Sequence, residues 1–108
     1  MDDFKKERKK LQELMLSKAD RSMKRFLALD SDIYDDGALD RKTKELLGLV
    51  ASTVLRCDDC ISYHLSTCKD LGVTDEELTE ALDVALVVGG SICIPHIRRA
   101  FRTWESSG

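Results

Sequence analysis

The residues from Thr74 to Gly90 read TDEELTEALDVALVVGG, and they contain the clearest helix signal in the sequence. Thr74 and Glu77 form a capping box, in which each side chain accepts a hydrogen bond from the backbone N–H of the other residue. This box predicts a helix that continues to about Val88. Its apolar residues point in nearly every direction around the axis: Leu78, Ala81, Leu82, Val84, Ala85, Leu86, Val87 and Val88. A helix that is apolar all round is buried on all sides, so we expect a second subunit to help cover it.

Apolar residues recur at helical spacing through almost the whole sequence, which contains only one Pro and six Gly to interrupt them. We therefore predict an all-α fold and one domain over residues 1–108. Gly72 suits the left-handed conformation that often ends a helix, and Asp58 or Asp59 is the expected N-cap of the helix before it. The other expected helices span about 3–29, 41–55, 58–71 and 95–104, with an acidic connector at 30–37.

The composition excludes several classes of protein. Lys and Arg number 17 against 20 Asp and Glu, so the net charge is -3 and the sequence lacks the basic excess typical of nucleic-acid binding. The charged run 4–10 replaces the apolar region of a signal peptide, and the apolar stretch 84–95 is too short for a transmembrane helix. We expect a cytoplasmic protein with no nucleic-acid or membrane partner. Four Cys in such a reducing compartment indicate catalysis or metal binding rather than structural disulfides.

Two of these cysteines stand in the motif Cys57-x-x-Cys60, and His64 follows four residues after the second. Residues three and four apart share one face of a helix, so the thiols can meet each other and the imidazole can reach Cys60. The first turn of a helix favours an anion, and His64 can accept a proton as a general base. Cβ atoms three residues apart on a helix are ~5–6 Å apart, whereas a relaxed disulfide requires ~3.5–4.5 Å. A bridge between Cys57 and Cys60 therefore requires either that Cys57 lies just outside the helix or that the bridge is strained.

Glu45 precedes Cys57 by twelve residues, on the expected helix 41–55. Periodicity of 3.6 residues per turn places Glu45 opposite the apolar face of that helix, as a solvated surface carboxylate. However, Gly48 and Ser52 share its stripe, and small side chains there would let another helix approach. A carboxylate beside such a groove could face the thiols and take part in a proton relay.

Together, Glu45, Cys57-x-x-Cys60-x-x-x-His64, Gly72 and Gly89-Gly90 resemble the carboxymuconolactone decarboxylase/alkyl hydroperoxidase D family, over roughly residues 39–101. The resemblance implies a helical fold assembled as a trimer or hexamer, and a peroxidase that uses both thiols. By position, Cys60 would attack the hydroperoxide, Cys57 would resolve the sulfenic acid into a disulfide, and His64 and Glu45 would move the proton through a bound water. The redox-active disulfide would be the only redox group, with no separate cofactor. A lipoyl or thioredoxin-like partner would reduce it.

Two alternatives remain open at this point. A lyase of the decarboxylase branch would use His64 and Glu45 on a lactone or keto acid, although that branch typically lacks the Cys pair. A non-catalytic metal or redox-responsive module would use Cys57, Cys60 and His64 as zinc ligands. Such a site would need a fourth ligand, for which the candidates are Cys68, Cys93 and His96.

The remaining candidate residues have structural interpretations. Cys68 and Cys93 are expected to be buried core thiols, and His96 to be structural or at an interface. Tyr63 could border the site or pack beside it. The arginines of the last helix could pair with acidic groups or bind an anionic substrate: Arg98, Arg99 and Arg102.

Overall fold

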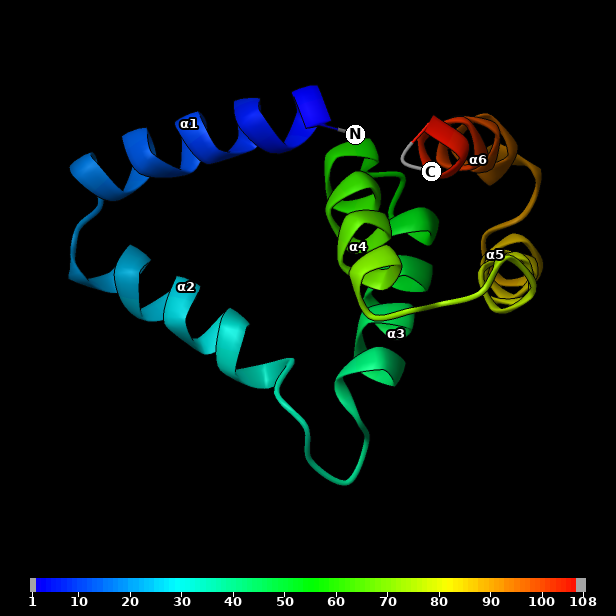
Figure 1. Cartoon of the computed structure of the whole chain (residues 1–108), viewed down its shortest axis with the longest axis horizontal. Helices are drawn as coiled ribbons and strands as arrows, with labels where there is room; N and C mark the ends of the chain where they lie inside the picture. The colour runs from blue at the N-terminus through cyan, green and yellow to red at the C-terminus, as the bar shows by residue number, and fades with distance from the viewer. Residues whose placement is uncertain (1, 107–108) are drawn as a thin grey trace. The chain divides into compact units, whose positions relative to one another are not determined.

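The computed structural model describes residues 2–106, which form α-helices and one short 3-10 helix, with no strand among them (Figure 1). This confirms the predicted all-α fold. The elements are α1 (Asp2–Lys18), α2 (Arg21–Ile33), α3 (Arg41–Val54), α4 (Asp58–Asp70), α5 (Asp75–Gly89), η1 (Ser91–Cys93) and α6 (Ile94–Ser106). Contacts between Cα atoms divide the chain into two compact units, one formed by Asp2–Arg41 and one by the chain from Lys42 onward.

In the first unit, the prediction of a single long helix over residues 3–29 is wrong, because two helices occupy this stretch. The chain leaves the helical conformation at Ala19 and Asp20, between α1 and α2. Asp20 is the N-cap of α2, because its backbone is extended and its carboxylate accepts a hydrogen bond from the N–H of Met23 at 2.9 Å. The α2 helix then continues to Ile33, so the acidic connector begins only at Tyr34. Periodicity missed the break because apolar residues keep their helical spacing across it.

The second unit contains the hydrophobic core. Its buried side chains come from α3, α4, α5 and α6 and from the loop after α4: Leu49, Ile61, Leu65, Cys68, Val73, Leu78, Leu82, Ala100 and Trp104. The α4 helix packs directly on α6. Trp104 also donates from its indole Nε1 to the Asp75 carboxylate at 2.8 Å, which ties the end of α6 to the start of α5. These contacts fix the helix on which the Cys motif lies.

The structure confirms the local sequence signals around the start of α5, but it does not confirm that this helix is buried on all sides. Both hydrogen bonds of the Thr74–Glu77 capping box are present, and Gly72, after α4, has a φ of +80°. Leu78, Leu82 and Ala85 are buried, whereas Val84, Val87 and Val88 are 54, 85 and 68% exposed. Within one chain, therefore, α5 is not covered on all sides.

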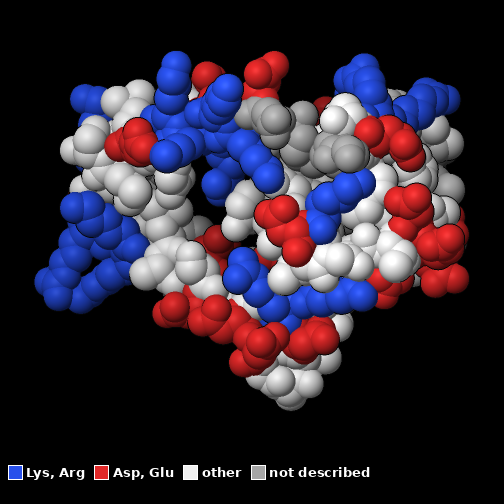
Figure 2. All heavy atoms as spheres, viewed as in Figure 1, with Lys and Arg blue, Asp and Glu red and all other residues white. Residues whose placement is uncertain are grey.

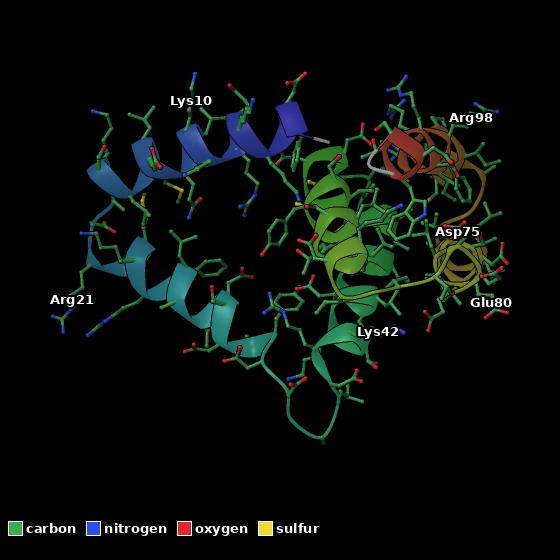
Figure 3. All side chains as sticks on the ribbon, viewed as in Figure 1. Lys10, Arg21, Lys42, Asp75, Glu80 and Arg98 are labelled. Atoms are coloured by element: carbon green, nitrogen blue, oxygen red, sulfur yellow. The ribbon has the colours of Figure 1, made fainter. Side chains whose placement is uncertain are left out.

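Charges of both signs occur on the second unit. Figure 2 shows acidic side chains over α5 and basic side chains over α6, at the right of the view. In Figure 3, Asp75 and Glu80 mark the acidic α5 and Arg98 marks α6. Among residues 2–106, no helix has the length and apolar character needed to cross a bilayer.

The capping box can be tested through stability. We expect Thr74→Ala to lower the free energy of unfolding by about 1 kcal/mol, because the N–H of Glu77 loses its acceptor. The measurement is urea denaturation followed by circular dichroism. Thr79→Ala is the matched control, since the Thr79 hydroxyl donates to a carbonyl within α5 and caps nothing. Equal losses in both variants would contradict the assignment.

Candidate functional site

The candidate site begins at the three-residue link between α3 and α4. The N–H of Arg56 donates to the carbonyl of Thr53, and the N–H of Cys57 donates to the carbonyl of Ser52, each at 3.0 Å. This pair of hydrogen bonds is the Schellman pattern that closes a helix. Arg56 has a φ of +60°, a left-handed conformation that usually favours glycine. The closure of α3 therefore determines where Cys57 lies.

Cys57 is itself the N-cap of α4, so the predicted cap at Asp58 or Asp59 is wrong. Its backbone is extended, and its Sγ accepts a hydrogen bond from the N–H of Cys60 at 3.3 Å. Asp58 and Asp59 occupy the first turn instead. A thiol is an unusual cap, and the general preference for Asp at this position gave the wrong residue. Of the two alternatives for a bridge, the structure has the first, because Cys57 lies just outside the helix.

The two thiols of the motif lie together. The Sγ atoms of Cys57 and Cys60 are 2.7 Å apart, and Cys60 is exposed. A disulfide bond is ~2.05 Å long, so closure requires about 0.7 Å of approach. The neighbouring Cys57 thiol, partial burial and the Asp59 charge together raise the pKa of Cys60 to about 11. In the reduced pair, these influences outweigh the first turn of α4, which by itself favours an anion.

His64 lies one turn after Cys60 on the same face of α4, and it is held from α3 by Glu45. The distance from His64 Nδ1 to Glu45 Oε2 is 2.7 Å, and both side chains are buried. A carboxylate oxygen can only accept a hydrogen bond, so we assign the proton of the neutral imidazole to Nδ1 and the basic lone pair to Nε2.

Glu45 has no exposed surface, so the surface position given by periodicity is wrong. Its second oxygen, Oε1, accepts no hydrogen bond from any described residue. A buried polar atom without a partner costs ~1–3 kcal/mol. The carboxylate therefore has one oxygen that positions His64 and a second that can accept a proton or a water molecule.

The other thiols lie inside the fold, as expected. Cys68 is completely buried, and burial together with the nearby Glu45 charge raises its pKa to about 12. Cys93 is also buried, with its Sγ 3.6 Å from the carbonyl oxygen of Thr53. Among residues 2–106, no group of three or more His, Cys, Asp or Glu side chains has an arrangement suited to a metal ion.

A pairing that sequence analysis missed connects the motif to α6. Asp58, between the two cysteines, accepts from His96 Nδ1 at 2.8 Å and from Arg99 Nε at 3.0 Å. Burial alone would raise the pKa of Asp58, but these hydrogen bonds hold it below its usual value. The spacing of His96 and Arg99 places them on one helix face, yet nothing in the sequence identified Asp58 as their partner.

The structure thus brings the four candidate residues into two adjacent pairs, Cys57 with Cys60 and Glu45 with His64. One pair supplies thiols and the other supplies a positioned imidazole. Tyr63 borders the second pair, with its ring centroid 5.3 Å from that of His64. Such an arrangement can exchange thiols for a disulfide while a neighbouring base moves a proton.

Comparison with solved structures gives strong matches. A carboxymuconolactone decarboxylase family protein from Thermotoga maritima, whose suggested role is in the antioxidative response, is 59% identical in sequence. It superposes with a TM-score of 0.92, over 96% of this chain and 88% of that one.

Curated relatives are more distant. A protein of the cox locus of Paracoccus denitrificans, itself uncharacterised, is 35% identical over 69% of this chain and 68% of its own length. A Corynebacterium aurimucosum protein named alkyl hydroperoxide reductase AhpD is 40% identical over 56% of this chain, which spans only 34% of that relative. The model of the carboxymuconolactone decarboxylase family matches residues 20–103, and the chain belongs to this family.

Proposed function

We propose that this protein is a thiol-dependent peroxidase that reduces hydroperoxides through the pair Cys57 and Cys60. The observation that supports the proposal most directly is the contact of the two Sγ atoms at 2.7 Å, on the helix face that also carries His64. The relatives named alkyl hydroperoxide reductase point to the same chemistry. These relatives are much longer proteins, because the chain matches only 37% and 34% of their lengths.

The proposed cycle has three steps. The Cys60 thiolate attacks one peroxide oxygen, the O–O bond breaks, and Cys60 becomes a sulfenic acid. The departing alkoxide takes up the proton that His64 removed from Cys60 and leaves as the alcohol. The sulfur of Cys57 then attacks that of Cys60, which forms the disulfide and releases water. A dithiol donor, such as a lipoyl or thioredoxin-like protein, returns two electrons and two protons and leaves as a disulfide. The cycle requires a reducing compartment, and we propose the cytoplasm.

The buried pair of His64 and Glu45 provides a way to ionise Cys60. With a pKa of about 11, Cys60 is mostly a thiol at neutral pH, so its attack depends on removal of the proton. His64 lies one turn away and can accept this proton at Nε2, while Nδ1 keeps its hydrogen bond to Glu45. The developing imidazolium would then lie 2.7 Å from the Glu45 carboxylate.

We further propose that the protein acts as a homo-oligomer. An apolar groove of about 520 Å³ lies between α3 and α5. Its lining is apolar except for one threonine: Thr43, Leu46, Leu47, Val50, Ala51, Val54, Leu55, Ala81, Val84 and Val88. Contiguous exposed apolar surface is typical of interaction sites, and another copy of the chain would cover the uncovered side of α5. We expect a trimer or hexamer.

The first test concerns the thiols. We expect wild-type protein to consume one equivalent of hydroperoxide for two thiols, and Cys60→Ser to abolish turnover. Cys57→Ser should stop at the sulfenic acid, because no thiol remains to resolve it. Mass spectrometry of alkylated protein before and after peroxide distinguishes these products. Full peroxidase activity in Cys60→Ser would overturn the mechanism, and activity on a lactone or keto acid that survives thiol alkylation would favour the lyase.

The same assay tests the base. His64→Gln should lower the rate of Cys60 oxidation by about 100-fold, in the range of general-base contributions. Thr67→Ala is the control, because Thr67 also lies on α4 and its hydroxyl donates to the Tyr63 carbonyl rather than to Glu45. A similar loss in both variants would indicate a structural effect instead.

The second test concerns the pKa of Cys60. The neighbouring thiol is the largest cause of its elevation, so Cys57→Ser should lower this pKa from about 11 toward the ordinary value of ~8.5. The thiolate fraction at pH 8 then rises, and alkylation by iodoacetamide becomes faster. The pH profile of the alkylation rate measures the midpoint. Asp59→Asn should move it less, and an unchanged midpoint in Cys57→Ser would contradict the assignment.

The third test concerns the groove. Val88→Asp should reduce the molar mass measured by light scattering, because a carboxylate in an apolar interface loses its hydration without a partner. Thr79→Asp places the same charge on α5 outside the groove and should keep the wild-type mass. A monomeric wild-type protein at micromolar concentration would refute the oligomer proposal.

A further inference from the structure

The first turn of α4 is bound to α6 through Asp58, and this contact has no role in the proposed cycle. Asp58 is the first residue of α4, directly after Cys57 and two residues before Cys60. Its two carboxylate oxygens are bound separately: Oδ1 lies 2.8 Å from His96 Nδ1, and Oδ2 lies 3.0 Å from Arg99 Nε. Both partners come from α6, far along the chain.

The proton positions of this cluster follow from the contacts. Arg99 only donates hydrogen bonds, so its Nη2, 3.2 Å from His96 Nδ1, would need a bare nitrogen there. A bare Nδ1 would then face a carboxylate oxygen at 2.8 Å, which is repulsive. The favourable arrangement has Nδ1–H donating to Asp58, with Arg99 bound to the same carboxylate. Asp58 therefore has a donor for each oxygen and a defined orientation.

We propose that Asp58 is a positioning residue, which fixes the first turn of α4 to α6 and thereby holds Cys57 and Cys60 at disulfide-forming distance. This inference requires only that the two thiols form a disulfide, which is one part of the proposed function. It does not require peroxide to be the oxidant.

The attachment of Asp58 restrains the reduced state more than the oxidised state. The covalent bridge itself restrains the two cysteines once they are oxidised. In the reduced protein, they are restrained by the closing hydrogen bond of Cys57 to α3, by the cap hydrogen bond of Cys57 and by the attachment of Asp58. Releasing Asp58 therefore increases the freedom of the dithiol more than that of the disulfide, and disulfide formation becomes less favourable. Asp58 and Arg99 are 49 and 42% exposed at their side chains, so a modest effect is expected.

The experiment is a thiol–disulfide equilibrium on the full-length protein. In the exchange with oxidised glutathione, the two cysteines lose two electrons and two protons, and two molecules of reduced glutathione form. Equilibration at varied ratios, followed by acid quenching, alkylation and mass spectrometry of the peptide containing both cysteines, gives the equilibrium constant. We expect Asp58→Asn to lower it about fivefold, a shift of about 20 mV.

Two matched controls separate positioning from charge. Asp59→Asn removes the same charge from the same turn, but no described residue forms a hydrogen bond or ion pair with the Asp59 side chain. It should change the constant by less than about twofold. On α6, Arg99→Met should resemble Asp58→Asn, whereas Arg98→Met should resemble wild type, because Arg98 extends from α6 into open space (Figure 3).

Equal shifts for Asp58→Asn and Asp59→Asn would show a charge effect and overturn the proposal. Unchanged constants in both Asp58→Asn and Arg99→Met would overturn it as well. Thermal unfolding identifies any variant that fails to fold. If either Asp58→Asn or Arg99→Met fails to fold, the equilibrium constant of the other variant decides the test. The measurement contains no peroxide, so a protein that forms the disulfide without peroxidase activity would contradict the proposed function and leave this inference standing. A wild-type protein that forms no disulfide would contradict both.

Discussion

The hydrogen bond between Glu45 and His64 is the interaction on which the candidate site depends. It joins α3 to α4 inside the fold, at a distance of 2.7 Å, and it gives a buried carboxylate a partner that burial makes necessary. Removing the imidazole would leave a second buried oxygen of Glu45 without a donor, which costs ~1–3 kcal/mol and more for a charged group. The same contact therefore stabilises two helices and orients the imidazole beside Cys60.

The link between α3 and α4 adds a second constraint. Arg56 adopts a left-handed conformation, with a φ of +60°, which costs a non-glycine residue ~1–2 kcal/mol. The closing hydrogen bonds of Arg56 and Cys57 compensate for this cost. Because only three residues join the two helices, the chain has little freedom between Glu45 and the thiols, and the two halves of the site keep a fixed relation.

Sequence reasoning succeeded where the information is local. The relation between Cys60 and His64 depends on one helix, whose periodicity alone places them on a common face. The position of Glu45 depends on how two helices pack, and a stripe containing Gly48 and Ser52 permitted both a surface and a buried location. The break at Asp20 was missed because the apolar spacing continues through it, and only the cap hydrogen bond reveals it.

Because Cys57 caps α4 through its sulfur, oxidation of the cysteine pair would alter a backbone hydrogen bond. The sulfur that accepts the N–H of Cys60 is also the sulfur that a disulfide would bond. Oxidation would replace a polarisable thiol or thiolate acceptor with a weaker one, at the positive end of the α4 dipole. The amide nitrogen and proton of Cys60 should therefore change their NMR chemical shifts when the disulfide forms.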